Sequence, residues 1–211
     1  MKTNELTFRQ LENRICFVYS DGLDSEYSIM LNDFVDLDKA NGFLAFVYVD
    51  HKDGVLFDVL CNAHIDENGN IEAFDGNNEN FLRIRKNAFE DLDVVVLDVT
   101  SEYYNVFEYK INTTMAQAKQ RSTEVADYVR KMTFLDGSRA MSYPDDLAVL
   151  YMSEDKQPEV IWCRVEGMDG NMIQGTVLND SLTGYPAKQG DTVSFGVAEY
   201  MGAPTCIKII E

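Results

Sequence analysis

The stretch 159-EVIWCRVEGMDGNMIQGTVLNDSLTGYPAKQGDTVSF-195 decides the fold of the C-terminal part of the chain. The run around Trp162 is rich in aromatic and β-branched residues, which favour a half-buried strand. Gly170-Asn171 suits a tight hairpin turn, and Met172 to Leu178 predicts the returning strand. Further strands are expected after Gly190-Asp191 and from Cys206 to Ile210. We therefore predict a small antiparallel barrel or sandwich.

Three motifs follow one another in this stretch: Trp162-x-Arg164-Val165, then Gly175 with Leu178-Asn179-Asp180, and then Gly190-Asp191-x-Val193-x-Phe195. Their order resembles the YegJ-like family of bacterial proteins (domain of unknown function 2314). The preceding Tyr143-Pro144-Asp145-Asp146 resembles the lead-in of some members. The resemblance implies a bacterial protein with a C-terminal β-domain and a relation to immunity-like proteins of toxin systems. It implies no catalytic residue.

The composition indicates a globular, strongly acidic protein. Hydrophobic residues make up 45% of the 211 residues, and 18 Lys+Arg face 36 Asp+Glu, a net charge of -18. This charge disfavours nucleic acid as a partner, because phosphate-backbone binding requires a basic face. It favours a basic protein partner or a cation, although a solvated acidic surface is the simpler alternative.

The charged residues are distributed unevenly along the chain. Residues 1–112 hold 9 Lys+Arg and 22 Asp+Glu, residues 113–133 hold 4 and 2, and residues 134–211 hold 5 and 12. We therefore predict an α+β protein with an N-terminal antiparallel sheet domain (1–112), a bridging helix (113–133) and a small C-terminal β-barrel-like domain (134–211).

Strand patterns dominate the N-terminal part. Phe43 to Val49 and Val55 to Cys61 flank Asp53-Gly54, which predicts a hairpin. Val94 to Val99 is continuously apolar and predicts a central strand buried on both faces. Tyr103 to Ile111 alternates aromatic and polar residues and predicts a strand. Its aromatic residues suit either a binding surface or the half-exposed side of a sheet: Tyr103, Tyr104, Phe107 and Tyr109.

Thr113 to Met132 is predicted to form one helix. Thr114 and Gln117 have the spacing of a capping box. Apolar residues form one stripe along it: Ala118, Val125, Val129 and Met132.

The four cysteines are widely spaced within apolar runs, which predicts buried free thiols: Cys16, Cys61, Cys163 and Cys206. The polar start of the chain and the absence of a long apolar run predict a cytoplasmic protein that is not membrane-bound. Reduced thiols fit that compartment.

No metal or cofactor is predicted. Cys61-x-x-His64 has a spacing that zinc uses, but zinc requires four ligands. The only other histidine, His51, is expected to be exposed beside a turn. Asp66-x-Asn68-x-Asn70 resembles the start of a calcium loop, yet Ile71 replaces the glycine that such a loop needs. A hairpin turn is therefore favoured.

The most concentrated polar group is Asp145-Asp146 with Asp136 and Arg139. Paired carboxylates can perform acid–base chemistry, but such acids more often cap a helix or bind an arginine, and we favour a salt bridge to Arg139. The candidate binding residues are Arg139, Asp145, Asp146, Trp162, Arg164 and Asn179.

The sequence thus favours a non-enzymatic, acidic, cytoplasmic protein that binds a basic protein, as an immunity-like protein would. One alternative is an enzyme or metal-dependent module that uses Asp136, Asp145 and Asp146 at the domain junction. Another is a homo-oligomeric structural protein.

Overall fold

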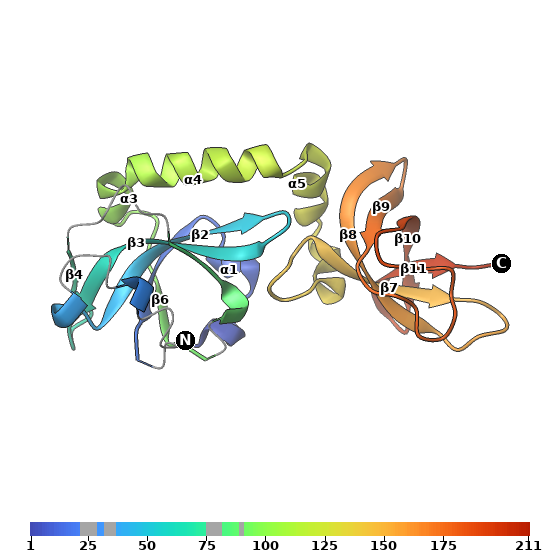
Figure 1. Cartoon of the computed structure of the whole chain (residues 1–211), viewed down its shortest axis with the longest axis horizontal. Helices are drawn as coiled ribbons and strands as arrows, with labels where there is room; N and C mark the ends of the chain where they lie inside the picture. Colours follow the sequence, from blue (N-terminus) through green and yellow to red (C-terminus); the bar gives the residue numbers. More distant parts are fainter. Residues whose placement is uncertain (22–28, 32–36, 75–81, 89–90) are drawn as a thin grey trace. The chain divides into compact units, whose positions relative to one another are not determined.

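The computed structural model describes residues 1–21, 29–31, 37–74, 82–88 and 91–211, and it confirms the α+β class. The chain divides into two compact units, Met1–Arg121 and Ser122–Glu211, each with its own sheet (Figure 1). Predictions for residues 22–28, 32–36 and 75–81 lie outside the described ranges.

The first unit is built on one sheet whose strands differ in length. The strand order is β4-β3-β2-β1-β6, and β5 also pairs with β3. The strands are β1 (Arg14–Tyr19), β2 (Gly42–Asp50), β3 (Gly54–Ile65), β4 (Ile71–Ala73), β5 (Arg83–Arg85) and β6 (Val94–Val96). The predicted β2–β3 hairpin is confirmed, with Gly54 at φ 77° closing its turn. The Asp50 carboxylate accepts hydrogen bonds from the backbone amides of Lys52 and Asp53.

Both faces of this sheet are covered (Figure 1). One core contains Phe8 and Leu11 of α1 (Phe8–Leu11), and the other contains Phe107 and Ala118 beside α3 (Tyr103–Val106) and α4 (Glu108–Arg121). Alternate residues of each strand belong to alternate cores, as the two-residue period of a strand requires. Short 3-10 turns are η1 (Thr3–Glu5), η2 (Leu37–Lys39) and η3 (Lys86–Ala88).

The predicted central strand at Val94 to Val99 is wrong. Only β6 forms there, it lies at the end of the strand order, and Val95 is 38% exposed. A continuous apolar run indicates burial but not the position of a strand in its sheet. Here the next apolar residue, Leu97, leaves the strand and enters the core beneath α4.

The strand predicted over Tyr103 to Ile111 is also wrong, because this segment forms α3 and the start of α4. Tyr103, Phe107 and Ile111 recur at four-residue intervals, which also fits one helical face. That face packs on the sheet, whereas Tyr109 is 76% exposed. The aromatic set therefore serves mainly as core.

The single helix predicted over Thr113 to Met132 is wrong as well. It is two helices: α4 ends at Arg121, and α5 (Glu124–Arg130) begins after Thr123, whose hydroxyl accepts from the Ala126 amide. Thr114 is inside α4 and caps nothing. The predicted apolar stripe is divided between the two units. Ala118 packs in a core of the first unit, and Val129 packs in the core of the second.

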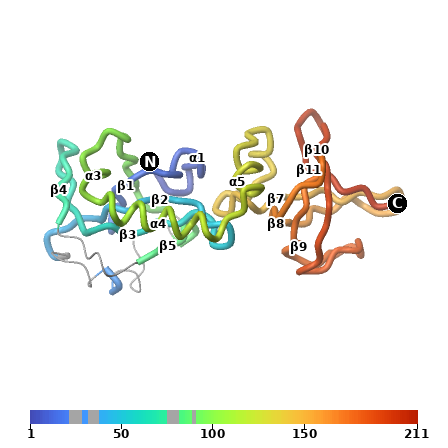
Figure 2. Tube along the Cα trace, turned by 90° about the horizontal axis from the view of Figure 1, so that it is seen from above, coloured from blue at the N-terminus to red at the C-terminus, as the bar shows by residue number. Residues whose placement is uncertain are grey.

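The second unit is a closed barrel with the strand order β10-β11-β7-β8-β9 (Figure 2). The strands are β7 (Asp146–Met152), β8 (Glu159–Asp169), β9 (Met172–Val177), β10 (Thr192–Tyr200) and β11 (Ala203–Ile209), with η4 (Thr133–Ser138) before them. The expected sheet is antiparallel except where β11 pairs in parallel with β7. A Cβ atom at Gly175 would lie 2.7 Å from the Arg164 carbonyl oxygen, so only glycine fits this close approach of two backbones.

Candidate binding surface on the C-terminal barrel

All six predicted binding residues lie in the second unit. Asp146 is on β7, Trp162 and Arg164 are on β8, and the other three are on adjoining segments: Arg139, Asp145 and Asn179. Arg139 forms a bridge with Leu147, Asp146 lies opposite Arg164, and Asn179 accepts from Trp162, so these residues lie around the β7–β8 pair.

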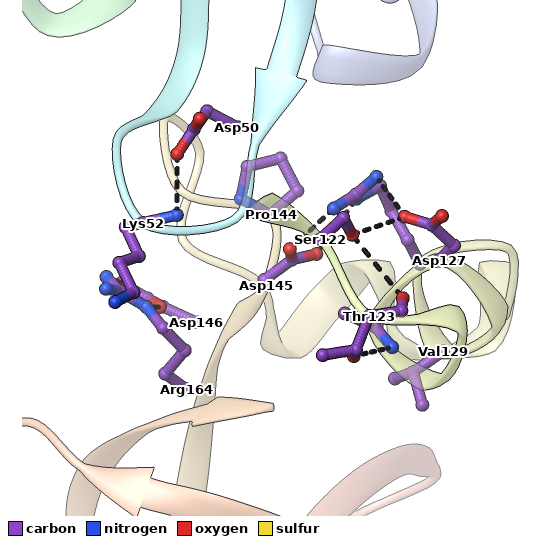
Figure 3. A network of polar contacts seen from close by, with 12 residues as sticks. Asp50, Lys52, Ser122, Thr123, Asp127, Val129, Pro144, Asp145, Asp146 and Arg164 are labelled. Carbon is purple, nitrogen blue, oxygen red and sulfur yellow. Dashed lines mark hydrogen bonds and ion pairs between the residues drawn. The ribbon is translucent and has the colours of Figure 1, made fainter. Parts of the chain in front are cut away.

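Asp145 is held by a buried arginine on α5. Its carboxylate accepts hydrogen bonds from Arg130 Nε at 2.9 Å and Nη2 at 2.6 Å, and both side chains are more than 90% buried. Arg130 also contacts Asp127 at 3.1 Å, and Asp127 accepts from the Ser122 hydroxyl (Figure 3). Such a desolvated two-point pair requires both partners, because either charge alone would be costly to bury. It anchors α5 to the segment that leads into β7.

Asp146 forms a second two-point pair, with Arg164 across the β7–β8 ladder. The distances from Asp146 to Arg164 Nε and Nη2 are 2.7 and 2.9 Å (Figure 3). The hydrogen bonds from Arg164 to Asp146 raise the pKa of the guanidinium. Both adjacent aspartates are thus engaged by arginines, an arrangement typical of structural ion pairs rather than of acid–base catalysis.

Asp145 and Asp146 pair with Arg130 and Arg164, and Arg139 forms its ion pair with Asp136, the third aspartate of the predicted group. Its Nε donates to Asp136 at 3.2 Å, and its Nη2 donates to the Val129 carbonyl at 2.6 Å. Sequence proximity suggested Arg139, but α5 brings Arg130, 15 residues away, closer to Asp145. Arg139 instead satisfies carbonyl groups at the end of α5.

Trp162 is on the outside of the barrel and is 37% exposed. Its neighbours Ile161 and Cys163 point inward and are fully buried, so alternation along β8 turns the indole outward. The Trp162 backbone amide donates to Asn179 Oδ1 at 2.9 Å, which fixes the loop after β9 against β8. Of the six candidates, Trp162 offers the largest apolar surface to a partner.

The other sequence candidates are structural. His51 is 3% exposed, so the expectation that it faces solvent is wrong. The Asp66 carboxylate accepts from the backbone amides of Asn68 and Asn70, both at 2.8 Å, and from the Asn70 side chain. These hydrogen bonds, led by those from Asn70, lower the pKa of Asp66. This segment is the hairpin turn that the sequence favoured.

Cys61 is fully buried on β3, and His64 of the same strand lies opposite Glu72 of β4. Across the described ranges, no three His, Cys, Asp or Glu side chains are grouped as a metal would require.

Sequence reasoning missed a buried polar cluster between β3 and α4. Asp58 accepts from the Thr114 hydroxyl, and Lys110 Nζ donates to the Val59 carbonyl at 2.6 Å. Burial raises the pKa of Asp58 and lowers that of Lys110. Lys110 and Thr114 are four residues apart, so a correct helix assignment would have placed them on one face. The groups of this cluster join the helix to the sheet.

Comparison with known proteins gave no relative. No protein-family model, curated protein or solved structure matches the chain. The resemblance to the YegJ-like family therefore remains a proposal. None of the described helices is both long and apolar enough to cross a membrane.

Proposed function

We propose that this protein is a non-enzymatic binding protein whose partner is a basic protein. The observation that carries the proposal is the acidic charge of both units. Met1–Arg121 holds 11 Lys+Arg and 22 Asp+Glu, and Ser122–Glu211 holds 7 and 14. Two acidic units attract a basic protein over a longer range than contacts alone and favour rapid association.

The state of the reactive groups supports binding rather than catalysis. Burial raises the pKa of the Cys16, Cys61 and Cys163 thiols to about 12 and that of Cys206 to about 11. These thiols stay protonated at neutral pH, whereas a nucleophilic cysteine requires the thiolate. The arginine pairs that engage Asp145 and Asp146 likewise favour a structural role over the alternative of an acidic catalytic or metal site.

We also propose that the protein is bacterial and cytoplasmic. The resemblance of residues 159–195 to the YegJ-like family supports a bacterial, immunity-like protein that neutralises a basic toxin. A cytoplasmic location is supported by four cysteines that are all free in the structure.

The test is capture of partners by the tagged full chain from host lysate, followed by titration with each purified candidate. We expect one basic protein to bind stoichiometrically at about 50 mM salt and far more weakly at about 500 mM, because salt screens exposed charges. An unrelated protein of equal negative charge serves as bait control. If no basic candidate binds this chain more tightly than it binds the control bait, the proposal is overturned. A light-scattering mass of 24.0 kDa for the free chain would remove the homo-oligomer alternative.

A further inference from the structure

The outward side chains of β7 from Ala148 to Met152 are all apolar, whereas Asp146 at the start of the strand pairs with Arg164. Leu147, Val149 and Tyr151 point into the barrel and are fully buried or nearly so. Ala148, Leu150 and Met152 alternate with them and are half-buried on the outside. A strand whose outer face meets only water normally carries polar residues there. From Ala148 to Met152 the outer face of β7 is apolar instead.

The neighbouring strands extend this outer face in register. Ala148 lies opposite Trp162, and Leu150 lies opposite Val160 on β8. On the other side, Leu150 lies beside Ile207 and Met152 beside Ile209 of β11. We call the set the apolar wall: Ala148, Leu150, Met152, Val160, Trp162, Ile207 and Ile209. Val160 is 51% exposed and Ile209 is 72% exposed.

The exterior of β8 beyond Trp162 and of β9 is more polar. Met172 of β9 is apolar and 41% exposed, but the other outward residues there are Arg164, Glu166, Gln174 and Thr176. They are polar and partly bonded to one another, since the Thr176 hydroxyl donates to Glu166 at 3.3 Å. The fold therefore does not require an apolar exterior. A contiguous exposed apolar face on one side marks an interaction surface.

The closed barrel limits how a partner can bind. Every barrel strand is paired on both sides, from β10 round to β9. A partner that covers the central strand β7 therefore meets a strand that already has two neighbours, and it binds there through side chains.

The charged groups near the apolar wall are mainly acidic. Glu154 and Asp155 are exposed and follow Met152 within three residues. Lys156 points elsewhere, because its Nζ donates to the Gly184 carbonyl and lies 5.2 Å from the Tyr185 ring centroid. Lys208 alternates with Ile207 and Ile209 along β11 and so belongs to the opposite face.

The apolar wall and the acidic residues near it favour one kind of binding partner over others. A second copy would bring two units with 14 acidic and 7 basic residues together, and they would repel. An anionic membrane surface would be repelled for the same reason. A protein segment that carries both apolar side chains and Lys or Arg complements the apolar centre and the acidic surroundings.

We infer that the apolar wall is the docking surface for a protein segment in which apolar residues alternate with Lys or Arg. The inference rests on the proposed function and adds to it where the basic partner binds. Val160, Trp162 and Ile209 would supply the central apolar contacts, and the acidic residues around them would select for basic neighbours.

The test uses the full chain and a display library of random 12-residue peptides. We expect the selected peptides to alternate apolar residues with Lys or Arg and to lose affinity by about tenfold for the double variant Val160→Gln, Ile209→Gln. Both replaced side chains are well exposed, so the thermal unfolding of the variant should match that of the native chain. The matched control is Met201→Gln, which alters an exposed apolar residue (90%) at the β10–β11 turn, and it should bind as the native chain does.

The outcomes separate the two proposals. If basic peptides or a basic partner bind the double variant as tightly as the native chain, the inferred docking surface is wrong. The proposed function then still stands. Selection of acidic or uncharged peptides, or of none, overturns the docking surface. Absence of any basic protein partner in the lysate experiment overturns both.

Discussion

Glu159, the first residue of β8, shows how one side chain can hold a long loop. Its carboxylate accepts from the Ser181 hydroxyl at 2.7 Å, from the Leu182 amide at 2.7 Å and from both the amide and hydroxyl of Thr183. Burial alone would raise the pKa of Glu159, but these hydrogen bonds outweigh it and lower the pKa from 4.5 to about 2. The loop after β9 therefore depends on a charged residue that forms no salt bridge in the described parts of the chain.

The shift in Glu159 predicts a pH dependence. A carboxyl whose pKa is lower in the folded state stabilises the fold fully above pH 4.5, and this contribution is lost as the pH falls towards 2. We expect Glu159→Gln to unfold about 1 kcal/mol more easily at pH 7, since charge-assisted hydrogen bonds are lost. The difference from the native chain should vanish near pH 2. Urea unfolding followed by the fluorescence of Trp162, the only tryptophan, measures it.

The control for this experiment is Glu199→Gln, at an exposed site on β10, which should leave the free energy of unfolding unchanged within about 0.5 kcal/mol. A Glu159→Gln difference that persists at pH 2 would mean that the carboxylate does not hold the loop.

At the scale of elements, α4 packs on its sheet through polar and small residues. Lys110, Thr114 and Ala118 are its buried residues, and they recur at four-residue intervals. This face has few of the apolar residues by which a helix is normally recognised. The cluster of Asp58, Lys110 and Thr114 replaces apolar contacts with hydrogen bonds and charge, which makes the attachment of α4 sensitive to single substitutions.

The attachment can be tested by a double-mutant cycle on Asp58 and Lys110. Lys110→Met removes a buried cation whose charge acts on the Asp58 carboxylate, and Asp58→Asn removes the negative charge that acts on Lys110. In both single variants Arg83 stays, with its Nε 3.9 Å from Asp58 in the native chain. We expect each change to cost about 3 kcal/mol, and the double variant to cost clearly less than the sum. Chemical unfolding gives the free energies, and hydrogen exchange of the α4 amides locates the effect.

Lys119→Met is the matched control, because Lys119 is an exposed lysine on the same helix. It should cost less than about 0.5 kcal/mol. Strictly additive losses for Asp58 and Lys110 would show that the two groups are not coupled and that α4 is held by its apolar neighbours.

At the scale of the whole molecule, the chain consists of two units with separate cores. The second unit begins at Ser122, so it includes α5. Val129 of α5 is fully buried in the barrel core, and Arg130 of α5 pairs with Asp145. The barrel therefore needs a helix that precedes its first strand by more than ten residues.

This division predicts which fragment folds alone. Residues 122–211 should give a cooperative unfolding transition and the same Trp162 emission as the full chain, because their core and ion pairs are complete. Residues 134–211, the domain that the sequence indicated, lack α5 and leave Asp145 buried without Arg130, and should remain unfolded or be strongly destabilised. Equal stability of the two fragments, measured by urea unfolding, would show that α5 is not part of the barrel unit.

The sequence by itself determined the α+β class, the β2–β3 hairpin and the strands of the barrel from Trp162 onward. These features depend on local information, because alternation and turn residues such as Gly54 and Gly170 act within a few residues. It also located the polar group at Asp145 and Asp146, and the acidity on which the proposed function depends.

Only the tertiary structure decided the partners and the boundaries. Arg130 rather than Arg139 reaches Asp145, because helix α5 packs on the barrel. The helical segment is divided between two units because its apolar residues meet two different cores. The apolar wall likewise arises only when β7, β8 and β11 are aligned, since Ile209 and Val160 are far apart in the chain. Contacts between distant residues depend on packing free energy, which no local sequence pattern encodes.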